Sequence, residues 1–187
     1  MIEYRNRFQF AAPRHTGGEW FVKAVRLAGL GSAWADQIYE PFPEKHNDLL
    51  RVSLVRHPVD WLLNHWVVGV DGNHVGEFAS IPTDSSFREF LCQCLEHPGA
   101  VGRLFQQYEA DSVIRFEDLP LAFVELARMM GVDERLIGSS FFSRPPIEQI
   151  MERGDCRGTS SLESIPGWLR REVCNSEKWL LDTYDYW

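Results

Sequence analysis

The sequence predicts a single α/β domain built on a mainly parallel sheet, and three observations support this class. Short apolar runs alternate with longer amphipathic segments, as in chains whose parallel strands are joined by helices. Polar turns follow the first two predicted strands directly. The length of 187 residues, with 44% apolar and 25% charged composition, suits one globular domain covering 1–187.

The first strand is predicted at 7–12 because the run is short and apolar. An amphipathic helix is predicted at about 18–30, where apolar residues repeat with helical spacing. These residues are Trp20, Phe21, Ala24, Val25, Leu27 and Ala28. The stretch 32–48 holds two prolines and little periodicity, which predicts a surface loop. A second strand is predicted at 49–55, and Pro58 marks the start of the next helix.

The second half of the chain continues the alternation. A long exposed loop, of the kind that forms a lid or recognises a substrate, is predicted at 69–85. The further predicted elements are helices at 86–96 and about 99–108, a strand at 112–116, a helix ending near 130–131, a short helix at 133–137 capped by Asp133, and a final helical pair at about 166–174 and 176–184. The aromatics Trp168 and Trp179 of this last pair are predicted to be buried.

Charge and composition limit the function classes. The net charge of −8 argues against a general nucleic-acid or membrane-surface binder, although a pocket for a small anion needs only a few cations. No apolar run approaches the roughly 20 residues that span a bilayer, and the N-terminus lacks a signal-peptide core, so we expect a cytoplasmic protein without membrane insertion.

The cysteines and histidines show no metal-binding spacing. There is no CxxC pair, and no HxxxH or HExxH motif. We therefore expect no metal, and reduced structural thiols at Cys92, Cys94, Cys156 and Cys174. Cys92 and Cys94 are two residues apart on a predicted helix and should point to different faces.

The stretch around Arg14-His15-Thr16-Gly17-Gly18 is the first candidate site. A strand, a tight glycine-bearing loop and a helix together offer backbone N–H groups and a positive helix end to a phosphate. The loop is neither a Walker A motif nor a dinucleotide fingerprint, because no Gly-Lys-Ser/Thr and no third glycine follow. The alternative is an ordinary turn that needs glycine for its backbone angles.

The second candidate site begins at Arg56, directly after the second predicted strand. Ligands of parallel sheets bind at the carboxyl ends of strands, beside a switch point in strand order. Asn64 lies slightly over two helical turns further on, so Arg56 and Asn64 could contact one phosphate. The alternative is that Arg56 pairs with Asp60 and stabilises the helix start.

Three segments, in the same order, resemble the sulfotransferases that use 3′-phosphoadenosine 5′-phosphosulfate (PAPS). The family's 5′-phosphosulfate loop, Pro-Lys-Ser-Gly-Thr-Thr-Trp, is similar to Pro13-Arg14-His15-Thr16-Gly17-Gly18-Glu19-Trp20. Its 3′-phosphate motif of Arg, Pro, Asp and a Ser eight positions after the Arg is similar to Arg56, Pro58, Asp60 and Asn64. Its later strand end and helix end are similar to Phe116-Glu117-Asp118-Leu119 and Met130-Gly131.

The resemblance implies a three-layer sandwich with P-loop NTPase-like architecture. It also implies transfer of a sulfuryl group from PAPS to a hydroxyl or amine of a small molecule or glycan, without a metal. The cofactor-binding residues that it implies are Arg14, His15, Thr16, Gly17, Gly18, Glu19, Trp20, Arg56, Asn64, Arg157 and Gly158. The alternatives are a core position for Trp20 and an exposed loop position for Arg157.

The chain departs from the family pattern within the loop. It has one extra residue before Gly17, Arg14 in place of the family's lysine, and Gly18 and Glu19 in place of two threonines. The implied catalytic residues are Arg14 and the base His46, with His15 and Glu19 as rival bases. Two other functions stay open. The chain could be a non-catalytic relative that binds an adenine nucleotide or a protein partner, or a small P-loop kinase, for which the lysine is missing.

Overall fold

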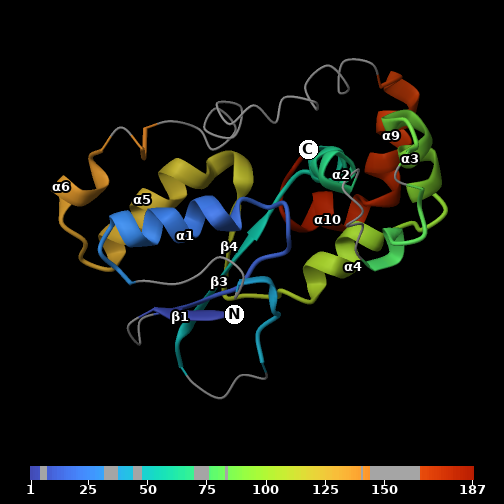
Figure 1. Cartoon of the computed structure of the whole chain (residues 1–187). Helices are drawn as coiled ribbons and strands as arrows, with labels where there is room; N and C mark the ends of the chain where they lie inside the picture. Colours follow the sequence, from blue (N-terminus) through green and yellow to red (C-terminus); the bar gives the residue numbers. More distant parts are fainter. Residues whose placement is uncertain are drawn as a thin grey trace. The chain divides into compact units, whose positions relative to one another are not determined.

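The computed structural model describes residues 1–4, 8–31, 38–43, 48–69, 76–82, 84–139, 141–143 and 165–187 (Figure 1). Its residues gather into two compact units, each made from two segments of the chain. The first unit comprises Met1–Val55 and Gln107–Gly154, and the second comprises Arg56–Gln106 and Asp155–Trp187. The single domain expected from the chain length stays a prediction.

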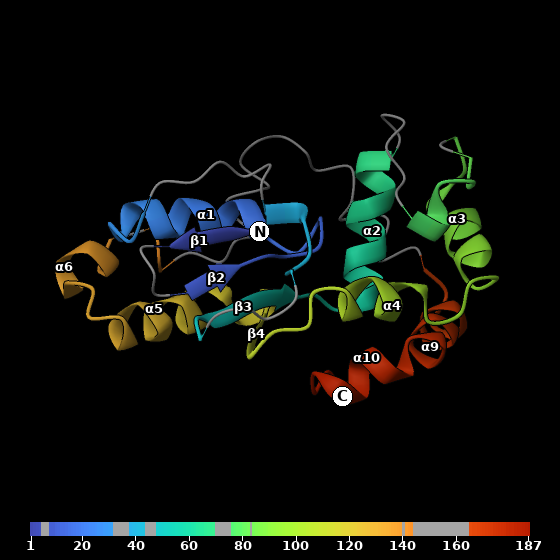
Figure 2. The ribbon, with the colours of Figure 1, turned by 90° about the horizontal axis from the view of Figure 1, so that it is seen from below.

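The first unit contains a mixed sheet, visible in Figure 2. Its strands are β1 (Ile2–Tyr4), β2 (Phe8–Phe10), β3 (Leu50–Val55) and β4 (Ser112–Arg115), in the order β1-β2-β3-β4. The β2–β3 and β3–β4 pairs are parallel, and β1 is antiparallel to β2. The predicted class, α/β with a mostly parallel sheet, is therefore confirmed, whereas β1 is too short to give a sequence pattern.

The helices of the first unit cover one face of this sheet. They are α1 (Gly18–Leu27), the 3₁₀ turn η3 (Phe116–Asp118), α5 (Leu119–Met129) and α6 (Glu134–Ile137). Both α1 and α5 lie on the same side of the strands in Figure 1, and they contact each other. The core between the layers is aromatic: Phe10 of β2 stacks on Phe21 of α1 with ring centroids 4.0 Å apart.

The opposite face of the sheet carries polar side chains. Gln9 and Arg51 are directly opposite each other on β2 and β3, so their side chains share this face. The Arg51 guanidinium lies over the ring of Phe42 at 5.4 Å and donates to the carbonyl oxygen of Pro43 at 2.6 Å. In the first unit, the described helices α1 and α5 thus form one layer on the sheet, and the predicted third layer stays a prediction.

The second unit is helical in its described part. Its elements are α2 (Pro58–Gly69), the 3₁₀ turn η2 (Gly76–Phe78), α3 (Phe87–Cys94), α4 (Ala100–Gln106), α9 (Gly167–Ser176) and α10 (Lys178–Thr183). Helix α2 packs on α3 and α9, and α10 packs on α4 and α9. The ring of Trp61 stacks on fully buried His65, with centroids 4.8 Å apart, beside Phe78 and Phe105. Buried aromatic packing holds this unit together.

Local signals place several helix starts correctly. Ser86 and Glu89 form a capping box at the start of α3, in which each side chain accepts from the other residue's backbone N–H. The predicted Asp133 cap is also confirmed, because its carboxylate accepts from the N–H of Arg135 at 2.8 Å. Such caps depend on residues two or three positions apart, so the sequence reveals them.

Two predictions about side chains have clear outcomes. Cys92 is exposed and Cys94 is buried, as expected for residues two apart on a helix. The burial predicted for Trp168 and Trp179 is wrong, because their side chains are 48% and 45% exposed. Smaller apolar residues of α9 and α10 face inward instead, namely Leu169, Val173, Leu180 and Leu181.

Candidate functional site

The residues predicted for the site divide between the two units. The loop from Arg14 to Gly18, with Glu19 and Trp20, belongs to the first unit, whereas Arg56 and Asn64 belong to the second. His46, Arg157 and Gly158 lie outside the described residues. The candidate site is therefore the loop that joins β2 to α1 in the first unit.

The loop follows β2 and enters α1 through residues in the left-handed backbone region. His15 has φ +66° and Gly17 has φ +88°. Such a conformation is ordinary for glycine but uncommon for histidine, so the loop holds one strained residue. Gly17 is the N-cap of α1, and its carbonyl oxygen accepts from the N–H of Phe21 at 3.0 Å.

In the described part of the chain, the N-terminus of α1 has no side-chain cap from its N-cap residue, Gly17. The N–H groups of a helix's first turn have no intrahelical acceptors, and the helix dipole adds a partial positive charge there. Serine, threonine, aspartate or asparagine commonly satisfies one of these N–H groups at the N-cap position, but Gly17 has no side chain to do so. This arrangement of glycine and helix start suits an oxyanion.

Close packing fixes the two loop glycines. A Cβ on Gly17 would lie 2.7 Å from Cδ2 of Phe116 and 2.8 Å from Cδ1 of Leu119. A Cβ on Gly18 would lie 2.4 Å from Cδ1 of Ile38. Both positions therefore need glycine for close approach, and Gly17 needs it for its backbone angle as well.

The side chain of Thr16 is turned into the protein. It is fully buried, and its hydroxyl donates to the carbonyl oxygen of Pro13 at 2.6 Å. This hydrogen bond closes the turn and uses the hydroxyl proton inside the loop. Thr16 would therefore contribute its backbone N–H, rather than a hydroxyl proton, to an oxyanion bound at this loop.

The guanidinium of Arg14 lies over an aromatic ring. The distance from its Cζ to the ring centroid of Tyr39 is 4.5 Å, within the range of a cation–π contact. The Arg14 side chain is exposed, and Tyr39 is partly buried. Burial raises the pKa of the nearby Tyr108 hydroxyl, and the positive charge of Arg14 partly opposes this rise. The loop thus carries a cation that lies against an aromatic ring.

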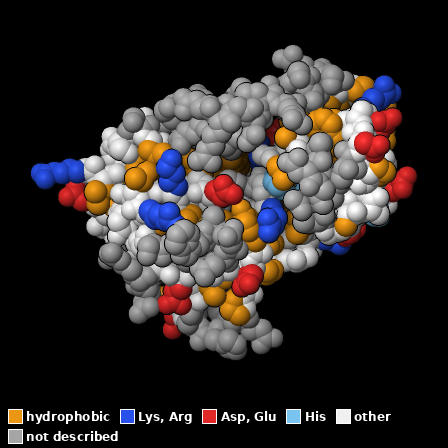
Figure 3. All heavy atoms as spheres, in the orientation of Figure 1, with side chains coloured by type: hydrophobic (Ala, Val, Ile, Leu, Met, Phe, Trp, Pro, Cys, Tyr) orange, Lys and Arg blue, Asp and Glu red, His pale blue; other side chains and the backbone are white. Residues whose placement is uncertain are grey.

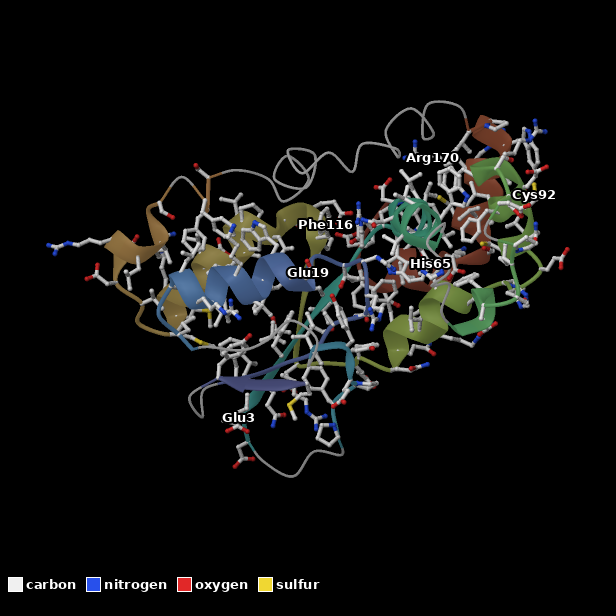
Figure 4. All side chains as sticks on the ribbon, viewed as in Figure 1. Glu3, Glu19, His65, Cys92, Phe116 and Arg170 are labelled. Carbon is white, nitrogen blue, oxygen red and sulfur yellow. The ribbon has the colours of Figure 1, made fainter. Side chains whose placement is uncertain are left out.

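Glu19 and Trp20 occupy the first turn of α1 but have different surroundings. Glu19 is exposed at the start of the helix, as Figure 4 shows. Trp20 is only 7% exposed and stacks on Phe141 at 5.1 Å, with Phe123 and Phe142 against its edges. Its indole Nε1 is buried and has no hydrogen-bond acceptor among the described residues. The core position weighed for Trp20 is therefore confirmed.

The predicted second half of the site starts where β3 ends. Arg56 follows Val55, the last residue of β3, and is only 6% exposed. Asn64 lies on α2 and is partly buried, and the ring of His57 meets Tyr186 edge-on at 5.6 Å. Both Arg56 and Asn64 therefore come from the start of the second unit, with Asn64 on a regular helix as predicted.

The switch point in strand order has no counterpart among the described strands. The three parallel strands β2, β3 and β4 are neighbours in sequence order. A switch-point crevice requires that consecutive strands diverge to opposite sides in the sheet. The order of the described strands therefore offers no switch point beside Arg56, and the predicted site there stays a prediction. The carboxyl ends of the three strands nevertheless share one edge of the sheet.

The third segment of the resemblance packs against the loop. Phe116, labelled in Figure 4 at the end of β4, starts the turn η3, and its ring limits the space at Gly17. Arg115, just before this turn, and Asp118, its last residue, form an ion pair at 2.6 Å. The Phe-Glu-Asp-Leu segment thus supports the loop by packing, which the resemblance alone did not indicate.

Sequence reasoning missed two residues beside the loop and one elsewhere. The ring of Tyr39 lies under the guanidinium of Arg14, and the carbonyl oxygen of Tyr39 accepts from the hydroxyl of Tyr108. Both tyrosines stand in segments with no recognisable motif. In the second unit, Glu177 is a buried carboxylate that accepts from the N–H groups of Val101 and Gly102. Burial raises its pKa, and these two hydrogen bonds oppose the rise. None of these contacts gives a local signal.

Within the described ranges, no group of three or more His, Cys, Asp or Glu side chains is arranged to hold a metal ion. None of the described helices is both long and apolar enough to cross a membrane. On the face shown in Figure 3, the visible Lys and Arg side chains are interspersed with Asp and Glu.

Comparisons with protein-family models, with curated proteins and with solved structures find no match to this chain. The class that the structure defines is therefore a mixed α/β protein with a four-stranded, mostly parallel sheet.

Proposed function

We propose that the chain is a PAPS-dependent sulfotransferase with a P-loop NTPase-like, three-layer architecture. It would transfer a sulfuryl group to a hydroxyl or amine of a small molecule or glycan. The observation that carries this proposal is the uncapped N-terminus of α1, directly behind a glycine turn at the carboxyl end of β2. Such a helix start is suited to an anionic phosphosulfate.

The roles of the loop residues follow from their positions. Backbone N–H groups at the start of α1 would bind the 5′-phosphate and sulfuryl oxygens, and the Arg14 guanidinium would stabilise charge on the bridging oxygen. The acceptor oxygen or nitrogen would bond to sulfur as the bond from sulfur to that bridging oxygen breaks. The acceptor's proton would pass to a general base, and 3′-phosphoadenosine 5′-phosphate would leave.

The remaining roles rest on the resemblance. Arg56 and Asn64 would bind the 3′-phosphate, and Arg157-Gly158 would complete that site. His46 is the proposed base, with His15 and Glu19 as alternatives. The carboxylate of Glu19 is exposed at the start of α1, where an acceptor molecule could reach it, whereas His15 is partly buried. Of the two alternatives, Glu19 is therefore the better candidate for the base.

A second candidate function is supported by the loop itself. The Thr16 hydroxyl proton is held by Pro13, and glycine and glutamate occupy the positions of the family's two threonines. A site with fewer hydroxyl groups and an added carboxylate suits binding more than transfer. A non-catalytic protein that binds an adenine nucleotide is therefore the alternative.

Calorimetric titration tests the proposal. We expect 3′-phosphoadenosine 5′-phosphate to bind without magnesium and at least about tenfold more tightly than 5′-AMP or ATP, because the 3′-phosphate adds a charge-assisted contact. Arg56→Ala should abolish this preference. Because Arg56 is buried, Arg56→Ala could lose binding through a folding defect. Arg56→Lys, which keeps the positive charge, is the second variant that tests for such a defect.

The control for these variants is Arg88→Ala, which removes an exposed arginine of α3. It should bind the nucleotide as the unaltered protein does. Preference for ATP with magnesium would overturn the proposal. Tight binding of the 3′-phosphorylated nucleotide without sulfuryl transfer from PAPS to any of a panel of phenols, amines and sugars would favour the non-catalytic alternative.

A further inference from the structure

Three aromatic side chains and one carboxylate gather on helix α10 and on the turn that follows it. They are Trp179, Asp182, Tyr184 and Trp187, and we call them the α10 aromatic surface. Trp179 and Asp182 are three residues apart on the helix, so their side chains are neighbours on one face. The indole Nε1 of Trp187 donates to Oδ1 of Asp182. The rings of Trp179 and Tyr184 meet edge-on, with centroids 6.2 Å apart. These contacts connect the four side chains into one cluster.

Both indoles of this surface are oriented by a contact at one edge and are otherwise open to solvent. Trp187 is 71% exposed even though its Nε1 is hydrogen-bonded to Asp182. Trp179 is 45% exposed, and its Cε3–Cζ3 edge packs on α4, where a Cβ added to Gly102 would lie 3.2 and 3.8 Å from these two atoms. Exposed large aromatic side chains are normal when they are scattered singly, whereas a cluster of them indicates an interaction site.

The charges around the two indoles favour a positively charged ligand. The face of an indole attracts a cation, and a neighbouring carboxylate adds to this attraction. Asp182 lies beside the exposed rings, and Asp185 is exposed in the turn after α10. Lys178 is the only basic residue in the stretch 177–187, so acidic side chains outnumber basic ones on this exposed segment. An anionic ligand would meet the carboxylates and is disfavoured for the same reason.

We infer that the α10 aromatic surface binds a small, soluble quaternary ammonium ion of the choline class. Such an ion has no N–H group to hydrogen-bond, and methyl groups surround its charge, so aromatic faces beside a carboxylate suit it. A primary ammonium group is strongly hydrated and would gain less from the same rings. A neutral sugar could stack on the rings but would gain nothing from the charge of Asp182. The inference is independent of the proposed function, in which no residue of this surface has a role.

The first measurement is an NMR titration of the full chain with choline and with its uncharged analogue, in which carbon replaces nitrogen. The indole Nε1–H signals of Trp179 and Trp187 are assigned by their loss in Trp179→Phe and Trp187→Phe. We expect choline to shift both signals and to bind about five- to twentyfold more tightly than the analogue, the effect of cation–π attraction to two exposed rings. Equal affinities for choline and the analogue would overturn the inference.

The second measurement repeats the choline titration on variants. Trp187→Ala removes a largely exposed ring and should weaken choline binding by about two- to fivefold without changing the urea midpoint of unfolding. Asp182→Asn keeps Oδ1 as the acceptor for Trp187 but removes the charge, so it should reduce the preference for choline over the analogue. The matched control is Trp168→Ala, since Trp168 is 48% exposed on α9 and precedes Arg170 and Arg171. It should bind choline as the unaltered protein does, and an equal loss in Trp168→Ala and Trp187→Ala would overturn the inference.

Two further ligands separate the competing occupants of this surface. The phosphate of phosphocholine would meet Asp182 and Asp185, so we expect phosphocholine to bind more weakly than choline. Tighter binding of phosphocholine would indicate a phospholipid headgroup and would overturn the assignment to a soluble cation. Methyl glucoside should leave the signals of Trp179 and Trp187 in place, and a sugar affinity equal to that of choline would also overturn the inference. So would the absence of any shift of the two indole signals with choline.

Discussion

The N-termini of α1 in the first unit and α4 in the second are treated in opposite ways. Helix α1 starts at a glycine turn and has no side-chain cap. At the start of α4, the N–H groups of Val101 and Gly102 donate to the carboxylate of Glu177, at 3.2 and 2.9 Å. Backbone donors at a helix start thus meet a protein carboxylate in the second unit, whereas the N-cap residue of α1 offers them no side-chain acceptor in the first.

The two kinds of helix start differ in their energetic cost. A buried carboxylate satisfies a helix start permanently, but its desolvation raises its pKa and makes its charge costly. A glycine turn leaves the donors unsatisfied by side chains, which reduces stability but creates a place for a ligand. The second unit uses the helix start for stability, and we propose that the first uses it for binding. Each choice can be tested by substitution.

The largest effect is expected for Gly17→Ala. The added methyl group would clash with Phe116 and Leu119, and φ +88° is strained for alanine, so we expect a loss of about 2–4 kcal/mol in the free energy of unfolding. Gly131→Ala is the control, because Gly131 has φ +71° but nothing within 4 Å of the added Cβ. It should lose only about 1 kcal/mol. Equal losses in urea unfolding would show that packing at Gly17 is not tight.

Glu177→Ala is expected to have the next largest effect. Removing the carboxylate leaves the N–H groups of Val101 and Gly102 without their acceptor inside the protein, which should lower the free energy of unfolding by about 2 kcal/mol. Glu172→Ala, at an exposed position of α9, is the control and should change it by less than about 0.5 kcal/mol. If the two variants unfold at the same urea concentration, the carboxylate does not stabilise α4.

The smallest effect is expected in how the free energy of unfolding depends on pH. The folded-state pKa of Glu177 is raised by burial, so the folded protein binds the proton more tightly than the unfolded chain. Its contribution to stability is present below the unfolded pKa of about 4.3 and is lost as pH rises through the folded value. Glu177→Gln should therefore gain stability relative to the unaltered protein as pH rises toward neutral.

Glu77 provides a control with the opposite sign. Its pKa is lowered by hydrogen bonds from Arg103, at 2.8 and 2.6 Å, so its contribution is present above the unfolded pKa and is lost as pH falls through the folded value. Glu77→Gln should lose stability relative to the unaltered protein as pH rises. Urea unfolding between the unfolded carboxyl pKa of about 4.3 and neutral pH checks both variants. If the stability of both variants relative to the unaltered protein changed in the same direction with pH, the assignment of Glu177 as buried and Glu77 as paired would be contradicted.

Much of the fold could be predicted because its signals are local. The apolar run at 49–55 became β3, the helical spacing after Gly18 became α1, and Asp133 caps α6 as expected. The failures concern choices between neighbouring residues. Trp168 and Trp179 remain half exposed because adjacent leucines and a valine fill the space inside. Helical periodicity does not determine which of several neighbouring apolar residues is buried.

The candidate site was predictable only in part. The sequence indicated the loop from its order of strand, glycine turn and helix, and the structure confirms that order. It could not indicate that the Thr16 hydroxyl is used within the loop, or that Trp20 is enclosed by Phe141 and Phe142. Those properties depend on where side chains point, which spacing alone does not determine.

The sequence by itself determined the α/β class, most helix and strand positions, and the place of the glycine turn. These depend on residues within a turn or two of one another. Only the tertiary structure decided that Tyr39 lies under Arg14 and that Glu177 reaches Gly102, 75 residues earlier in the chain. Contacts between distant segments form only when packing brings those segments together. Such a contact gives the start of α4 a carboxylate acceptor, whereas the N-cap residue of α1 provides none.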